Sequence, residues 1–185
     1  ESGLLPGPLR SESYVLLNAN VINFTSDLPL LIIHNFGAGS VPASQDQFAS
    51  LSFFEPGASG KTSLTNSPTL IARAAINLRG SSTLGYPKSS FAVEFHDEFD
   101  ANENISPLDL PAGDDWVLYA PNNFEPILVH NPLAFELSNQ IGRYAPRTRF
   151  VEVYVNTGGG AVSSANYNGI YVLAEKIKRG EERVD

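Results

Sequence analysis

Two cations flank a short polar turn between two apolar segments of the chain. Residues 77–90 read Asn-Leu-Arg-Gly-Ser-Ser-Thr-Leu-Gly-Tyr-Pro-Lys-Ser-Ser, so Arg79 comes just before Ser81 and Ser82, and Lys88 follows a few residues later. Such a turn offers backbone N–H groups, hydroxyl groups and positive charge, which together suit an anion such as phosphate. The alternative is an ordinary surface hairpin that carries one Arg and one Lys.

Two carboxylates are candidate partners for these cations. Glu175 ends the otherwise apolar segment Tyr-Val-Leu-Ala-Glu, and a buried carboxylate needs a cation or several hydrogen-bond donors. Arg79 or Lys88 would serve if their strands are neighbours. Glu136, in a predicted helix, is a second possible partner for Lys88. For both glutamates the alternative is a side chain that faces water.

Other patterns for a metal or nucleotide site fail on their spacing. Residues 97–115 are rich in Asp and Glu, which hard cations prefer, but they do not follow the EF-hand pattern, and a solvated acidic loop is the better interpretation. The three His residues lack zinc-site spacing. Residues 57–62 (Gly-Ala-Ser-Gly-Lys-Thr) resemble a P-loop, but Glu55 stands where its first glycine belongs and no helix is expected to follow.

Composition limits the class of protein and its partners. The chain has 185 residues, 42% of them hydrophobic, and a net charge of −8, which argues against nucleic acid or an anionic membrane as the main partner. Cys is absent, so disulfides and thiolate chemistry are excluded, and no apolar run is long enough to form a transmembrane segment. Met is also absent, even at position 1, so we expect a mature or excised segment.

The order of apolar segments predicts a mainly antiparallel sheet with one helix. Residues 1–12 are rich in Pro, Gly and Ser and predict a flexible arm, and residues 13–185 predict a single domain. One helix is expected over residues 132–141, with Leu133, Leu137 and Ile141 lining one face and Asn131 as its N-cap. The fold class is therefore α+β, a twisted sheet with one packed helix. The strands are expected at residues 14–21, 28–35, 48–54, 70–78, 91–95, 115–120, 149–156 and 169–177.

Several blocks, in this order, resemble the CotH family of spore-coat and secreted atypical kinases. They are Asn-Leu-Arg-Gly-Ser-Ser at 77–82, Pro-Lys-Ser at 87–89, Asp-Trp-Val-Leu-Tyr-Ala at 115–120, Arg-Tyr-Ala-Pro-Arg-Thr-Arg-Phe-Val-Glu-Val-Tyr-Val-Asn at 143–156 and Gly-Ile-Tyr-Val-Leu-Ala-Glu-Lys-Ile at 169–177. The resemblance covers roughly residues 70 to 185. It is carried by the order and spacing of the blocks together.

The resemblance implies a fold like a kinase N-lobe, with ATP and Mg²⁺ as cofactors and a Ser or Thr of a coat or secreted protein as phosphoacceptor. It makes Lys88 the cation on the nucleotide phosphates, with Arg79, Ser81 and Ser82 shaping the same loop. Glu175 matches the acidic residue of the family's Gly-x-Tyr-x-x-x-Glu strand.

The chain departs from the family in two respects. Glu125 stands where the family usually has Asp, and His130 where it usually has Arg. The family's metal-binding and catalytic aspartates are expected beyond residue 185, in a C-terminal half. We therefore expect no catalytic residue and no metal ligand in this chain, and no phosphate transfer by this part alone.

The function predicted is the N-terminal nucleotide-binding lobe of a CotH-like protein kinase. The expected partners are a protein substrate or surface partner and the C-terminal half of the same protein. A secreted, spore-coat or cell-surface location in a bacterium is implied by the same resemblance. The alternative is a non-catalytic secreted or surface module for binding or adhesion.

Overall fold

The computed structural model describes residues 14–122, 124–179 and 183–184, and β-strands dominate this part of the chain. The predicted arm at 1–12 lies outside the described residues. The strands are β1 (Thr25–Ser26), β2 (Leu30–His34), β3 (Gln47–Phe54), β4 (Thr62–Ser63), β5 (Leu70–Arg79), β6 (Ser90–His96), β7 (Asp115–Tyr119), β8 (Thr148–Asn156) and β9 (Tyr167–Glu175). The helices are α1 (His130–Gln140) and the 3₁₀ turns η1 (Ser82–Gly85), η2 (Pro107–Asp109) and η3 (Ser164–Asn166).

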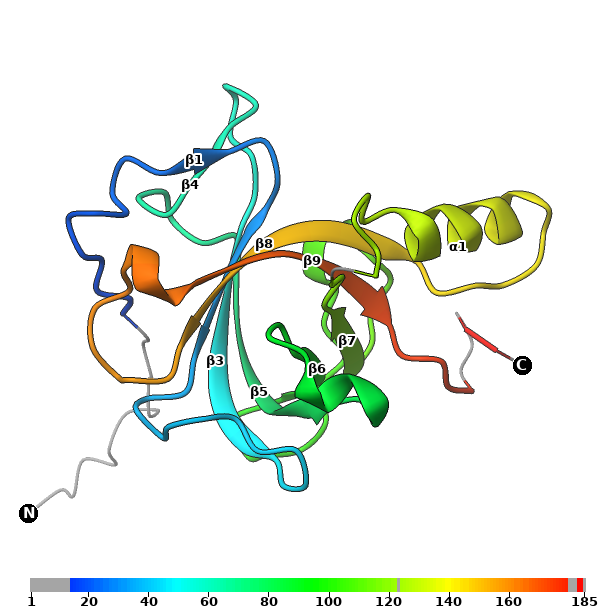
Figure 1. Ribbon diagram of the computed structural model, residues 1–185, viewed down its shortest axis with the longest axis horizontal. Coiled ribbons are helices and arrows are strands. Elements are labelled where there is room, and N and C mark those ends of the chain that lie inside the picture. Colours follow the sequence, from blue (N-terminus) through cyan, green and yellow to red (C-terminus); the bar gives the residue numbers. More distant parts are fainter. Residues whose placement is uncertain (1–13, 123, 180–182, 185) are drawn as a thin grey trace, which may run out of the picture.

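Seven of the strands form a closed barrel in the order β2-β3-β5-β6-β7-β9-β8 (Figure 1). Six neighbouring pairs are antiparallel, and the pair that closes the barrel, β2 with β8, is parallel. β1 and β4 form a separate two-stranded sheet. Closure leaves no unpaired edge strand in the barrel, which explains how a sheet of this length avoids an exposed hydrogen-bonding edge.

Side chains that alternate along the strands fill the barrel. Phe91, Val93 and Phe95 point to the same face of β6, as their period of two predicts, and all are buried. They join Trp116 of β7 and Tyr171 of β9 in one continuous core. A second, smaller cluster packs on the outside of the barrel, where Leu30, Ile32 and Phe54 meet the segment before β1. The outer face of β2 is thus buried as well, which explains its unbroken apolar sequence.

The predicted fold class, an α+β sheet with a packed helix resembling a kinase N-lobe, is wrong. The sheet closes on itself as a seven-stranded barrel, and only one α-helix is present among the described residues. Alternating patterns locate strands, but they do not reveal that β2 pairs with β8 across more than 100 residues of sequence.

The helix also packs differently from the prediction. α1 projects to one side of the barrel (Figure 1). Leu133 and Leu137 of α1 are each exposed by 53%, and Ile141, which directly follows the helix, by 73%. Buried Pro132 and half-buried Phe135 lie on another face of the helix. A stripe spaced four residues apart places Leu133 and Leu137 on one face of α1, but it does not predict what that face contacts.

Most of the predicted strands are present with ends shifted by one or two residues. The exception is the strand predicted at 14–21, where Leu17 makes a single bridge to Val162 and a turn follows. None of the described helices has the length and apolar character needed to cross a membrane.

Candidate functional site

The turn from β5 to β6 places Arg79 and Lys88 on one cavity. Gly80 directly follows β5 with φ +138°, and a side chain there would collide with the Thr83 hydroxyl, so the turn requires glycine at this position. η1 then carries the chain away from the sheet and back to Lys88. The sequence-based interpretation of a turn that brings two cations together is consistent with this arrangement.

Lys88 is held at the end of the β7–β9 pair. The β7–β9 ladder runs from Trp116 opposite Glu175 to Tyr119 opposite Val172, so Ile170 lies beyond it. The Lys88 ammonium donates a hydrogen bond to the Ile170 carbonyl, and its Nζ lies 4.4 Å from the centroid of the Tyr171 ring. Lys88 thereby donates a hydrogen bond to a backbone carbonyl that has no partner in the β7–β9 ladder.

Burial makes the Lys88 amine easier to deprotonate. The side chain is half-buried, and burial lowers its pKa to about 8, because the charged form loses solvation. No carboxylate of the described residues forms an ion pair with Lys88 to reverse this effect. A bound anion would supply the missing negative charge.

The cavity beside Lys88 has a volume of about 440 Å³. Its lining combines cations and polar groups with aromatic rings: Arg79, Gly80, Thr83, Lys88, Ser90, Val117, Tyr119, Ala120, Asn122 and Phe124. Ser81 and Ser82, predicted to shape this site, are exposed and do not line it, whereas Thr83 does. Of the three hydroxyl-bearing residues that follow Gly80 in the turn, Thr83 lines the cavity, and Ser81 and Ser82 do not.

A second, more apolar cavity of about 340 Å³ continues from the first, and the two share Arg79, Val117 and Tyr119. It lies between α1 and the outer face of β7 and β9. Its remaining lining residues are Asn131, Phe135, Pro146, Val172, Ala174, Glu175, Lys176 and Ile177. We refer to the two adjoining cavities together as the groove; Arg79 borders both, Lys88 lines only the first, and the second has the more apolar lining.

Glu125 links the wall of this groove to the start of α1. Its buried carboxylate accepts a hydrogen bond from the Tyr119 hydroxyl at 2.5 Å and one from the His130 backbone N–H at 3.0 Å. Burial, together with Glu125, raises the pKa of Tyr119, which therefore stays a neutral phenol. The sequence identified Glu125 and His130 only as departures from a family pattern, and Tyr119 was not identified at all.

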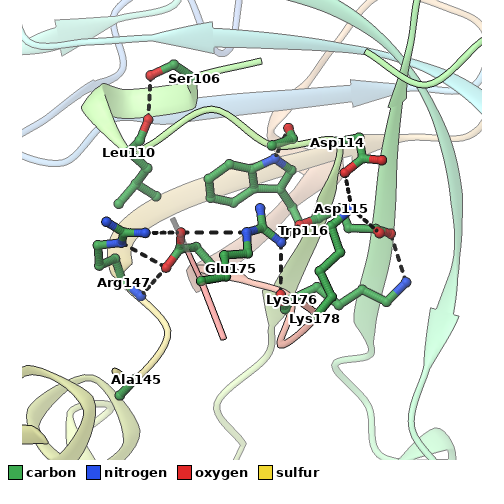
Figure 2. A network of polar contacts seen from close by, with 12 residues as sticks. Ser106, Leu110, Asp114, Asp115, Trp116, Ala145, Arg147, Glu175, Lys176 and Lys178 are labelled. Carbon is green, nitrogen blue, oxygen red and sulfur yellow. Dashed lines mark hydrogen bonds and ion pairs between the residues drawn. The ribbon is translucent and has the colours of Figure 1, made fainter. Parts of the chain in front are cut away.

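The structure pairs Glu175 with a different cation from the one predicted. Glu175 is 2% exposed, and the Arg147 guanidinium donates to both carboxylate oxygens, at 2.8 and 3.0 Å, as Figure 2 shows. The Arg147 backbone N–H adds a third bond at 2.8 Å, and Arg183 Nε lies 3.8 Å away. The need for a cation was inferred correctly, but neither Arg79 nor Lys88 supplies it.

Glu136 does not reach Lys88. It is exposed on α1 and accepts a hydrogen bond from Gln140 one turn later, at 2.8 Å. It is not among the residues that line either cavity. Of the six predicted site residues, Arg79 and Lys88 thus share a cavity, Glu175 reaches only the second, and Ser81, Ser82 and Glu136 reach neither.

Residues at the end of the acidic stretch form ion pairs with lysines. Asp114 and Asp115 bind Lys178, and Asp115 also binds Lys176 at 2.8 Å (Figure 2). Burial alone would raise the pKa of Asp114, but hydrogen bonds from Lys178 and Asn102 outweigh it and lower the pKa to about 2. Among the described residues, no group of three or more His, Asp and Glu side chains is placed to hold a metal ion.

Comparison with protein-family models identifies a family for this chain. The family model described as "CotH kinase protein" matches residues 76–185, which include the turn, the groove and the Arg147–Glu175 pair. No curated protein matches the chain.

Proposed function

Since the chain belongs to the CotH kinase protein family, we propose that its groove binds a nucleoside triphosphate for a protein phosphotransferase. The phosphates occupy the cavity beside Lys88 and Arg79. The acceptor is a Ser or Thr hydroxyl of a protein substrate.

The placement of Lys88 is the observation that carries this proposal. Its Nζ lies at a cavity of about 440 Å³ that Arg79 also lines, and none of the described Asp or Glu residues lines that cavity. A half-buried cation without a carboxylate costs free energy that a polyanionic ligand recovers. Arg79 adds a guanidinium, which binds phosphate oxygens through two parallel hydrogen bonds.

The apolar end of the groove suits the nucleobase. Phe135 of α1 faces the outer side chains of β7 and β9, among them Val117 and Val172, across a space of about 340 Å³. A planar, weakly polar ring fits a cavity with this lining, and the two cavities are of the size usual for small-molecule sites. Tyr119, fixed by Glu125, stands where the two cavities meet.

Mg²⁺ enters this proposal with the nucleotide, as the counter-ion of its phosphates. When bound it supplies charge neutralisation to the transferring phosphoryl group. Lys88 and Arg79 hold and orient the phosphates, and the neutral Tyr119 hydroxyl adds a dipole without adding negative charge. We extend the proposal to a secreted or spore-coat setting, as the family suggests. The alternative, a non-catalytic adhesion module, finds no support in the family match.

Calorimetric titration with Mg·ATP tests the proposal. We expect saturable binding that weakens by about 10- to 100-fold in Lys88→Ala, since a hydrogen bond to a charged group contributes about 1.5–3 kcal/mol. Lys61→Ala is the matched control, because Lys61 is an exposed lysine paired with Asp27 at 2.6 Å and outside the groove. It should bind Mg·ATP as the unchanged protein does.

Titration with inorganic triphosphate and with adenosine separates the two ends of the groove. Triphosphate binding should depend on Lys88, and adenosine binding on Phe135, tested as Phe135→Ala. Absence of saturable Mg·ATP binding to the folded protein, or equal affinity in Lys88→Ala, would contradict the proposal.

A further inference from the structure

One of the four lysines of the chain, Lys88, differs from the other three in the groups that surround its ammonium. Lys61, Lys176 and Lys178 each form an ion pair with an aspartate. Lys88 has no such pair with any described residue; its ammonium is directed at the Ile170 carbonyl and the face of the Tyr171 ring. An aspartate stabilises the charged, non-nucleophilic form of an amine, whereas a carbonyl oxygen also accepts a hydrogen bond from the neutral form.

The surroundings of Lys88 favour its neutral form. The charged and titratable groups that line its cavity are Arg79 from β5 and Tyr119 from β7, and Tyr171 of β9 lies beneath its Nζ. The two phenols are uncharged, since burial raises the pKa of both. Burial lowers the Lys88 pKa to about 8. By contrast, Asp114 and Asp115 raise the pKa of Lys178 against the opposing effect of burial.

The size of the cavity and the positive charge of Arg79 determine which electrophiles can reach the Lys88 amine. The cavity of about 440 Å³ admits a small molecule, and Arg79 on its wall attracts an anion. We infer that Lys88 is a covalent modification site for small acyl phosphates, whose phosphate group is held by Arg79 while the acyl group reaches the Lys88 amine. This inference goes beyond nucleotide binding and does not depend on it.

The reaction is balanced without a further reagent. The neutral amine nitrogen of Lys88 attacks the acyl carbon, an N–C bond forms and the C–O bond to phosphate breaks. The amine proton leaves with the phosphate as hydrogen phosphate. The product is an amide that carries no charge, so acylation removes one of the two cations of the cavity.

Acetylation by acetyl phosphate, mapped by mass spectrometry at each of the four lysines, tests the inference on the folded chain. Near pH 8 about half of an amine with a pKa of about 8 is neutral, against well under 1% at an ordinary lysine pKa. We expect Lys88 to react at least about 10-fold faster than Lys61, Lys176 or Lys178. Its rate should rise between pH 7 and 9 and then level off, while theirs should keep rising.

Two variants and one denatured sample serve as controls. In Lys88→Arg the fast site should disappear and the other lysines should react as before. In Arg79→Gln, acetyl phosphate should label Lys88 more slowly, whereas the uncharged reagent p-nitrophenyl acetate should label it at the original rate. In urea all four lysines should react equally, which provides the reference for each peptide.

Equal acetylation of the four lysines in the folded chain would overturn the inference. So would selective labelling of Lys88 by p-nitrophenyl acetate but not by acetyl phosphate, because the anionic class of reagent would then be wrong. Failure of Mg·ATP to protect Lys88 would count against the proposed nucleotide site alone and would leave the inference intact.

Discussion

The two ends of the β7–β9 strand pair differ in whether a buried charged group has a partner of opposite charge. At the end where Trp116 lies opposite Glu175, the carboxylate is 2% exposed and Arg147 donates to both its oxygens. At the other end, beyond Val172, Lys88 is half-buried without a carboxylate among the described residues. One strand pair thus carries a neutralised charge at one end and an uncompensated charge at the other.

This difference separates a structural role from a binding role. A buried charge with a complete set of partners offers nothing to a ligand, and removing one partner leaves the other uncompensated. A buried charge without a partner lowers stability until an anion binds. The paired end should therefore respond to mutation through stability, and the unpaired end through ligand binding and pH.

The largest effect should come from breaking the buried pair. Glu175→Ala removes a buried carboxylate that accepts three hydrogen bonds from Arg147, and we expect a loss of about 3–5 kcal/mol in the free energy of unfolding. Urea denaturation followed by the fluorescence of Trp116, the single Trp, measures it. Glu136→Ala, on the exposed face of α1, is the control and should change stability by less than about 0.5 kcal/mol. A loss below about 1 kcal/mol in Glu175→Ala would mean that the two ends do not differ as described.

A smaller effect should come from crowding the paired end. A side chain at Gly113 would fall on the Arg183 guanidinium, which is held by the carbonyls of Asp115 and Lys176. Gly113→Ala should therefore lower stability by about 1–3 kcal/mol, the usual range for overpacking. Gly85→Ala is the control, because no atom lies within 4 Å of the position of its added Cβ. Equal melting temperatures for the two variants would show that Arg183 is not fixed.

The sequence predicted individual strands well because each is a local pattern. In β6, Phe91, Val93 and Phe95 alternate with more exposed residues, and the structure buries all three. Closure of the barrel was missed because it depends on the parallel pairing of β2 with β8. That pairing follows from the twist and length of the whole sheet, which no local window contains.

The candidate site was only partly predictable for a similar reason. Arg79 and Lys88 were recognisable because one short turn carries both. The partner of Glu175 was not, because Arg147 lies on the segment before β8 and meets Glu175 only through the β8–β9 pairing. Tyr119 was missed because an aromatic residue at the end of an apolar strand resembles a core residue until its hydroxyl is seen to meet Glu125.

The unpaired end should show its difference as a dependence of stability on pH. The pKa of Lys88 is about 8 in the folded chain against 10.5 for a free lysine, so the unfolded chain binds more protons between these values. Stability from this group therefore rises as pH increases from about 8 to 10.5, and the cost of charging Lys88 in the folded state is fully present below pH 8.

Lys88→Met measures that contribution. The difference in unfolding free energy between the variant and the unchanged protein should favour the variant more at pH 7 than at pH 9.5, and comparing the two proteins removes the effect of other titrating groups. Urea denaturation at both pH values gives the difference. A difference that is independent of pH would mean that Lys88 is solvated as an ordinary surface lysine. The two ends would then differ in the arrangement of their side chains but not in the free-energy cost of a buried charge.

The smallest effect should be found at the paired end, in acid. Lys178 and Asn102 hold the Asp114 pKa at about 2, below the ordinary 3.8, so this carboxylate stabilises the fold above pH 3.8 and its contribution is lost as pH falls toward 2. Asp114→Asn should remove part of the acid sensitivity of the chain, and Asp109→Asn, on η2 and without a described ion pair, should not. Thermal melts between pH 2 and 5 compare the variants. Because Asp114 is partly exposed, its ion pair is weakened by solvent, and the shift in melting temperature should be smaller than that of Glu175→Ala or Gly113→Ala. An acid transition unchanged by Asp114→Asn would show that the Asp114–Lys178 ion pair does not contribute to stability. The Arg147–Glu175 pair alone would then distinguish this end of the strand pair from the end at Lys88.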